Sequence, residues 1–139
     1  RNALRMPIHI HNVTFDCADA RAQAAFWSTL TGWNVYYDDD PEVLVAPSYP
    51  HHGTGMLFIP VPEGKTAKNR VHLDIEPTEG TRDELVEKAV AEGAKVIGDF
   101  RKEDGSGWVT LTDPEGNEFC IERGASERPA RPRTFRLST

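Results

Sequence analysis

The chain of 139 residues is poor in cysteine and has no long apolar run. Its two cysteines, Cys17 and Cys120, are too few for a disulfide scaffold, and we expect free thiols in a reducing cytoplasm. The sequence leaves a single disulfide between them open. No run approaches the roughly 20 apolar residues of a membrane span, and residues 1–7 lack the apolar stretch of a signal peptide. We therefore expect a cytoplasmic protein with no membrane partner.

Two further absences narrow the chemistry. The sequence contains neither a phosphate-binding glycine loop nor the glycine-flanked serine of a hydrolase. An excess of positive charge is also absent: 22 acidic residues against 16 basic ones give a net charge of −6, which argues against a nucleic-acid partner. The exception is a basic C-terminal tail over 124–139. Together with Arg123, it carries a net charge of +4, and the rest of the chain carries −10. This tail either binds an acidic surface or is a solvated, proline-containing end.

The first half of the chain reads as a strand, a helix and three strands. Alternating apolar residues predict a strand over 8–15, and Asp19 predicts the N-cap of a helix over 20–30 that Gly32 ends. Further strands are expected over 33–37, 43–46 and 56–61.

The second half repeats this order. A strand is expected over 70–75, a helix after the capping-box pair Thr81 and Glu84 and before Gly93, and strands over 94–97, 108–112 and 118–122. Residues 31–35 align with 92–96 at an offset of 61, and Asn12 aligns with His72 at 60. We therefore predict one α+β domain built of two tandem βαβββ modules, 8–61 and 70–123, joined by a linker over 62–69.

Alternation within the strands predicts two different sheet faces. One face is apolar and should be covered by the helix of its module; it carries Val13, Phe15, Val71, Leu73, Ile75, Phe119 and Ile121. The opposite face is polar and carries His72, Asp74, Cys120, Trp108 and Thr110. That face either surrounds a ligand or simply meets water, as one face of many antiparallel sheets does.

Three segments resemble a known family. NVTFDCAD at 12–19, KNRVHLDI at 68–75 and GWVTLTDPEGNEFCIE at 107–122 resemble a glyoxalase-like domain of the vicinal oxygen chelate superfamily. That superfamily includes glyoxalase I, extradiol dioxygenases, and bleomycin- and fosfomycin-resistance proteins. The resemblance implies that the two modules form a cup-shaped mixed sheet with the helices outside, and that the protein is a homodimer. The fold alone does not choose among those functions.

The resemblance also implies where a metal would bind. The family's ligand positions fall here on Asn12, Ile59, His72 and Cys120. Isoleucine cannot bind a metal and asparagine is a weak donor, so we predict an incomplete metal centre and no cofactor. The rival prediction is a metal-dependent lyase or dioxygenase that binds a divalent metal through other residues: His51, His52, Glu118 or Glu122.

These observations lead to a hypothesis about function. We expect a small organic molecule to bind in a partly aromatic cup, with His72 as the catalytic residue for a proton transfer and Asp74 orienting it. The ligand-binding residues we expect are Asn12, Trp33, Asp74, Trp108, Thr110 and Cys120. Cys120 is alternatively an inert buried thiol, and His72 is alternatively satisfied within the sheet. A third hypothesis is a degenerate module that serves protein association.

Overall fold

The computed structural model describes residues 4–129 and 136–137. The chain separates into two compact units, Arg1–Ala67 and Lys68–Thr139, and each contains one four-stranded sheet. Arg131 and Arg133 of the predicted basic tail lie outside the described residues. Within the described part, no helix combines the length and the apolar character that crossing a bilayer requires.

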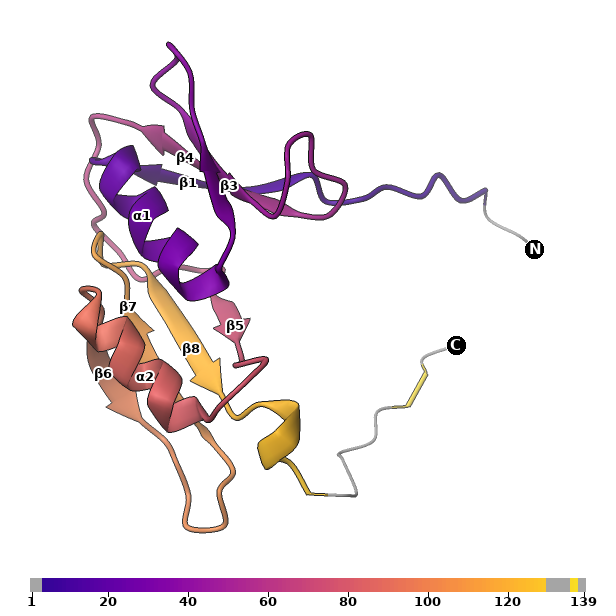
Figure 1. The fold of residues 1–139 in the computed structure, drawn as a ribbon, viewed down its shortest axis with the longest axis vertical. Coiled ribbons are helices and arrows are strands. Elements are labelled where there is room, and N and C mark those ends of the chain that lie inside the picture. Colours follow the sequence, from indigo (N-terminus) through magenta and orange to yellow (C-terminus); the bar gives the residue numbers. More distant parts are fainter. Residues whose placement is uncertain (1–3, 130–135, 138–139) are drawn as a thin grey trace. The chain divides into compact units, whose positions relative to one another are not determined.

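The first unit contains five elements. They are β1 (Asn12–Cys17), α1 (Ala20–Thr31), β2 (Asn34–Tyr36), β3 (Val43–Ala46) and β4 (Gly55–Pro60). The sheet order is β1-β4-β3-β2, in which β1 runs parallel to β4 and the other neighbours are antiparallel. Helix α1 lies along one side of this sheet (Figure 1).

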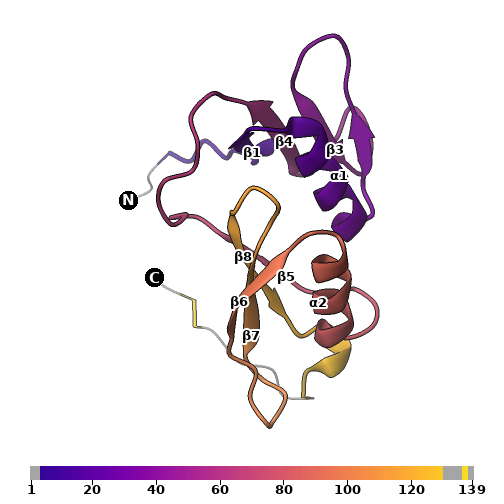
Figure 2. The same ribbon diagram turned by 90° about the vertical axis from the view of Figure 1, so that its left-hand side faces the viewer.

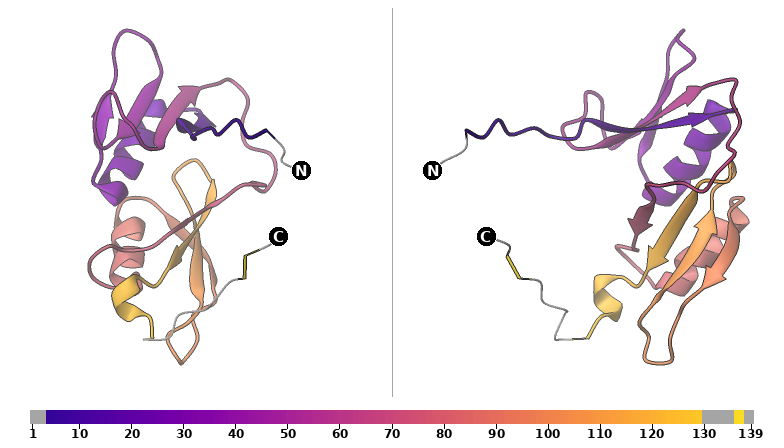
Figure 3. Two further views of the ribbon diagram at one scale, coloured as in Figure 1. Left: turned by 90° about the vertical axis from the view of Figure 1, so that its right-hand side faces the viewer. Right: turned by 180° about the vertical axis from the view of Figure 1, so that it is seen from behind.

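The second unit repeats the same arrangement. Its elements are β5 (Leu73–Ile75), α2 (Arg82–Ala91), β6 (Lys95–Asp99), β7 (Trp108–Thr112) and β8 (Glu118–Glu122). The order β5-β8-β7-β6, with β5 parallel to β8, matches that of the first unit strand for strand. Figure 2 shows α2 alongside this sheet, and Figure 3 shows the short helix η1 (Ala125–Glu127) that follows β8. The predicted α+β fold of two βαβββ modules is therefore confirmed, whereas the joint cup stays a prediction.

The helix ends follow from local chemistry that the sequence reveals. The Asp19 carboxylate accepts a hydrogen bond from the Ala22 N–H at 3.0 Å, and Gly32 ends α1 with a φ of 75°. Thr81 and Glu84 form the predicted capping box at the start of α2. The C-cap of α2 is Glu92, one residue before the predicted Gly93.

Two strands are shorter at their starts than the alternation predicts. The strand expected from Ile8 begins at Asn12, and Ile8 is 83% exposed. The strand expected from Arg70 begins at Leu73, and Val71 is 78% exposed, so Val71 does not belong to the covered face. Both predictions were wrong because apolar alternation continues past the residues that have a partner strand.

Each helix covers the apolar face of the sheet in its own unit. In the first unit the Phe15 ring stacks on Phe58 at 5.2 Å and on Trp27 of α1 at 6.2 Å. In the second unit, the buried apolar residues of α2 and of the covered sheet face are Val86, Ala89, Val109, Leu111, Phe119 and Ile121. Burying one such large side chain contributes about 2 kcal/mol, so these contacts determine which face each sheet leaves open.

Candidate functional site

The open face of the second sheet carries one row of polar positions. Asp74 pairs with Cys120, Cys120 with Thr110, and Thr110 with Gly98, across all four strands. Paired residues on neighbouring strands point to the same side of a sheet. Val109 and Leu111, which flank Thr110, are fully buried on the other side. The expected separation into a covered and an open face is therefore present in this unit.

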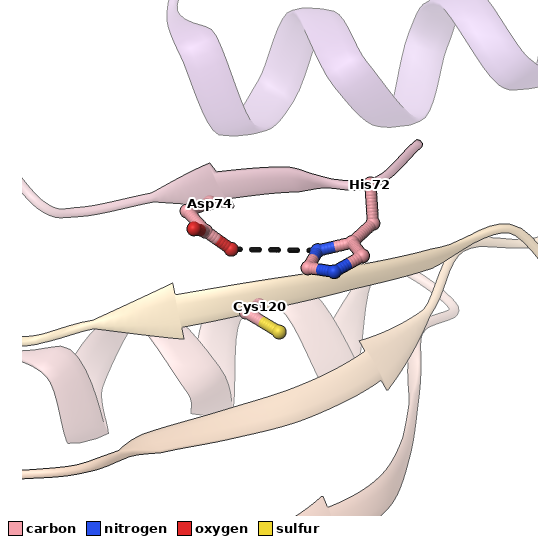
Figure 4. A group of neighbouring side chains, drawn as sticks. All are labelled: His72, Asp74 and Cys120. Atoms are coloured by element: carbon pink, nitrogen blue, oxygen red, sulfur yellow. Dashed lines mark ion pairs between the residues drawn. The ribbon is translucent and has the colours of Figure 1, made fainter. Parts of the chain in front are cut away.

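Three side chains meet at one end of this row. His72 precedes β5, Asp74 lies within it, and Cys120 lies on β8 (Figure 4). The Nδ1 atom of His72 is 3.5 Å from a carboxylate oxygen of Asp74. One potential ligand atom from each of the three residues lies within 4.8 Å of those of the other two. The His72 and Asp74 side chains are 41% and 55% exposed, so both are accessible from solvent.

The surroundings of Cys120 favour its neutral thiol. Burial raises the pKa of this thiol, the hydrogen bond with the Thr110 hydroxyl at 3.4 Å lowers it, and the charges of Asp74 and Glu122 raise it again. The net result is a pKa above the ordinary value of 9.0. Because the thiolate is the nucleophilic form, the raised pKa argues against Cys120 as a nucleophile.

Glu122 adds a further carboxylate to the same face. Burial raises the pKa of this carboxyl, and the charge of Asp74 raises it further. Glu118, four residues earlier on β8, accepts a hydrogen bond from the Asn69 N–H at 3.0 Å. The rival prediction offers Glu118 and Glu122 as ligands, and the pKa of Glu122 is affected by the charge of Asp74.

Aromatic rings border the polar row. Trp108 lies two residues before Thr110 on β7, and its ring stacks on Phe100 with a centroid separation of 5.1 Å. A side chain at Gly98 would meet the Phe100 ring at 2.7 Å, so the ring occupies the space above that glycine. Trp108 is 41% exposed and Phe100 is 50% exposed. The polar row therefore ends in an accessible apolar surface suited to a flat ligand.

The cluster can be tested against the metal that the family resemblance implies. Imidazole, carboxylate and thiolate are all zinc ligands, and three of them can leave a coordination position open. Mg²⁺ and Mn²⁺ prefer oxygen donors, which makes Cys120 a poor ligand for either. Metal binding would also require Cys120 to lose its proton against a raised pKa. The residues therefore fit a thiophilic ion such as Zn²⁺ by type.

The corresponding positions of the first unit are arranged differently. The Asn12 side-chain oxygen lies 2.9 Å from Nε2 of His51, which also lies 3.0 Å from the His11 carbonyl oxygen. Ile59 is half-buried on β4 opposite Asp16, four positions along the strand pair from Asn12. Asn12 thus already has a partner, and the first unit does not repeat the cluster of the second.

Of the expected site residues, the structure brings His72, Asp74, Cys120 and Thr110 together, and Trp108 lies on β7, the strand of Thr110. Trp33 is half-buried and is anchored through its backbone, whose carbonyl accepts a hydrogen bond from Ser28 at 2.6 Å. Sequence reasoning missed Phe100; the glycine two residues earlier was the available signal. His52 is exposed, whereas His51 is buried.

Comparison with known proteins identifies the family of this chain. The family model described as "Glyoxalase-like domain" matches residues 12–122. No curated protein matches the chain in sequence. Among solved structures, the fosfomycin resistance protein FosX from Mesorhizobium loti has a TM-score of 0.66 at 12% identity and covers 87% of this chain and 95% of its own.

Two more solved structures are similar to this chain in fold. A mutant FosX from Listeria monocytogenes, complexed with Mn(II) and a dihydroxypropylphosphonic acid, has a TM-score of 0.65 at 15% identity, covering 88% of this chain and 94% of its own. A glyoxalase/bleomycin resistance protein/dioxygenase family enzyme from Burkholderia phytofirmans has a TM-score of 0.63 at 19% identity, covering 82% and 97%. At these identities the structures support the fold, and together with the match over 12–122 they show that this chain belongs to the glyoxalase-like domain family.

Proposed function

We propose that the protein binds a small, flat organic molecule on the open face of the second sheet and exchanges a proton with it through His72. The observation that carries this proposal is the contact between His72 and Asp74, with 3.5 Å between Nδ1 and the carboxylate oxygen, on an accessible sheet face. A carboxylate accepts only, so this contact favours the tautomer with its proton on Nδ1. Nε2 of His72 is then left as a base.

The neighbouring residues support a role in proton transfer over one in covalent catalysis. Cys120 is held as a thiol, and Thr110 shares a hydrogen bond with it, so neither offers a ready nucleophile. A base such as His72 can remove a proton next to a carbonyl group, or hold one for a bound ligand. The Trp108 and Phe100 rings can bind the flat part of the ligand. A small aromatic carbonyl compound fits this combination.

A second candidate is a metal-dependent lyase or dioxygenase. The observation in its favour is the proximity of the three donor types of His72, Asp74 and Cys120, within 4.8 Å of one another. Here His72 and Cys120 would hold a thiophilic ion, which would supply a Lewis acid to polarise the ligand. The two proposals use His72 differently and predict opposite responses to zinc.

The proposal also covers the cellular location and the partners of the protein. The buried thiols of Cys17 and Cys120 fit a reducing cytoplasm. The family resemblance suggests a small molecule and a second copy of the chain as partners. The net charge of −6 opposes binding to nucleic acids. Sedimentation equilibrium would measure the dimer, and a single species at the 15.5 kDa monomer mass would contradict it.

An NMR screen of a library of small aromatic carbonyl compounds tests the main proposal. We expect hits to shift the amide signals of Thr110 and Cys120. We expect Trp108→Ala to weaken the binding of these hits. Thr14→Ala is the control, because Thr14 is an exposed residue of β1 in the first unit. Hits that leave both signals unchanged would contradict the proposal.

Adding Zn²⁺ to metal-free protein separates the two candidates. The metal-free proposal predicts no stoichiometric zinc and an unchanged melting temperature. The metal-dependent candidate predicts one zinc ion per chain, a raised melting temperature, and loss of both in Cys120→Ser and in His72→Ala.

A further inference from the structure

The first unit contains a cavity of about 560 Å³ that the proposed function does not use. It lies over the open side of the first sheet, and β1, β2, β3, β4 and the loop between β3 and β4 all contribute to its wall. This volume lies within the range of roughly 300–1,000 Å³ found for small-molecule sites. Every residue of the wall belongs to the first unit, so the cavity does not depend on the second.

Unpaired negative charge gathers on one side of this cavity. Asp38, Asp40 and Glu42 all line it, and they follow one another at alternate positions after β2. Asp38 and Asp40 accept hydrogen bonds from the backbone N–H groups of Asp40 and Glu42, at 2.8 and 3.0 Å. Among the described residues, no basic side chain forms an ion pair with any of these three carboxylates. The wall therefore favours a positively charged ligand.

Tyrosine rings line the same cavity. Tyr36 and Tyr49 both contribute to the wall, with ring centroids 5.6 Å apart and planes tilted by 39°. A third lining residue, Tyr37, has the Arg21 guanidinium 3.7 Å from the centre of its ring. Aromatic faces attract cations, and Arg21 illustrates this contact at Tyr37. Tyr36 and Tyr49 can make the corresponding contact with an incoming cation.

A buried histidine points to the kind of cation. His51 lines the cavity and is only 8% exposed. Its Nε2 lies 3.0 Å from the His11 carbonyl oxygen, which can only accept, so Nε2 carries the ring proton. Nδ1 is then a lone-pair acceptor, and it is buried without a hydrogen-bond partner among the described residues. An unsatisfied buried acceptor is costly, and a ligand that donates an N–H group would satisfy it.

We propose that this cavity binds a small organic cation that carries N–H donors, a protonated amine with an aromatic or apolar body. The carboxylates of Asp38, Asp40 and Glu42 balance its charge, the tyrosine rings contact its body, and Nδ1 of His51 accepts one of its N–H groups. This proposal uses no residue of the second unit and does not rest on the proton transfer at His72.

Calorimetric titration with three matched probes tests it. Benzylammonium has the charge and the N–H donors, benzyltrimethylammonium has the charge alone, and benzyl alcohol has neither the charge nor an N–H donor. We expect benzylammonium to bind one per chain and benzyl alcohol to bind at least about tenfold more weakly, because a hydrogen bond to a charged group is lost. We also expect the quaternary probe to bind more weakly than benzylammonium. Equal binding of all three, or no saturable binding of benzylammonium, would overturn the proposal.

Two acidic residues of the same turn provide matched variants. Glu42→Gln removes a carboxylate that lines the cavity, whereas Asp39→Asn removes one that is exposed and does not line it. We expect Glu42→Gln to weaken benzylammonium binding several-fold and Asp39→Asn to leave it within about twofold at 0.15 M salt, where distant charges are screened. Equal weakening by both would mean general charge attraction and would contradict a built site.

The histidine is best tested without changing it, because His51 also holds Asn12 and the His11 carbonyl. Nitrogen-15 NMR of the wild-type imidazole distinguishes its two nitrogens. We expect the free protein to show a protonated Nε2, and we expect benzylammonium, but not the quaternary probe, to shift the Nδ1 signal. An Nδ1 signal that responds equally to both probes would remove His51 from the site.

Discussion

The two units share a sheet order and differ in what their open faces carry. Both place the first strand parallel to the last and the remaining strands antiparallel. At corresponding positions, however, Asn12 is held by His51, whereas His72 is exposed beside Asp74. Ile59 likewise corresponds to Cys120. The fold thus depends on the covered face, which both units keep apolar, and the open face is free to differ in chemistry.

The sharpest test of that division compares neighbouring residues on β8. Phe119 is 1% exposed on the covered face, whereas Cys120 belongs to the open face. We expect Phe119→Ala to lower the free energy of unfolding by about 3–5 kcal/mol, because it leaves a cavity in the core. We expect Cys120→Ala to cost only about 1 kcal/mol, because it removes a single sulfur atom rather than an aromatic ring. Urea denaturation measures both, and equal losses would contradict the division.

The hydrogen bond between Asn12 and His51 in the first unit can be disrupted by a substitution at Gly55. A side chain at Gly55 would meet the Asn12 oxygen at 2.8 Å and Nε2 of His51 at 2.9 Å. We expect Gly55→Ala to cost about 1–3 kcal/mol of unfolding free energy by forcing these groups apart. Gly53 is the control, because a side chain there would meet nothing within 4 Å. Thermal denaturation that shows equal effects of Gly53→Ala and Gly55→Ala would count against a tightly packed Asn12–His51 pair.

Two substitutions on the open face of the second unit should shift the pKa of Cys120 in opposite directions. Asp74 raises the pKa of the Cys120 thiol and Thr110 lowers it, although burial is the largest cause of its elevation. Asp74→Asn should therefore move the pH midpoint for alkylation of Cys120 by iodoacetamide downward, and Thr110→Val should move it upward. Mass spectrometry separates Cys120 from Cys17. Shifts of the same sign in both variants would be incompatible with this arrangement.

The pKa of Cys120 also links stability to pH. A thiol whose pKa is raised by folding stabilises the folded state below the ordinary value, 9.0, and that contribution is lost as the pH rises through the higher folded value. We therefore expect Cys120→Ala to reduce the loss of stability above pH 9, measured by urea denaturation at increasing pH. An unchanged pH dependence would contradict a raised pKa at this position.

The smallest effect concerns two surface charges: Arg101 of the second unit is paired, whereas Glu42 of the first forms no ion pair among the described residues. Arg101 contacts Asp99 at 2.6 Å and Asp83 at 2.9 Å, and it holds the pKa of Asp99 down at about 2. That contribution is present above the ordinary pKa of 3.8 and is lost as the pH falls toward 2. We expect Arg101→Gln to lower the urea midpoint slightly at low salt only, and Glu42→Gln not to lower it. Insensitivity to salt would argue against an electrostatic origin.

Much of the fold was predictable because the signals are local. Asp19, Gly32 and the Thr81–Glu84 pair mark helix ends through contacts within one turn, and the period of two along β7 and β8 separates the covered from the open face. The same period, together with the family resemblance, predicted that His72 and Asp74 share a face and that Cys120 lies near them. These residues depend only on strand register, which the buried apolar residues fix.

The rest depends on packing that no local pattern encodes. The Phe100 ring lies over Gly98, next to a shift in the register of β6 between Val96 and Gly98, and alternation does not reveal such a bulge. His51 is buried because Gly55 opposite Asn12 leaves room for its ring, a long-range condition that a loop sequence does not show. The strand starts at Ile8 and Arg70 failed for a similar reason, since pairing partners lie far away in the chain.

The proposed function places the ligand on the open face of the second sheet. Its most direct test is the NMR screen with small aromatic carbonyl compounds, run on the wild-type chain and on Trp108→Ala. We predict hits that shift the amide signals of Thr110 and Cys120 in the wild type and bind more weakly to the variant. Hits that bind both proteins equally and leave Thr110 and Cys120 unchanged would contradict it.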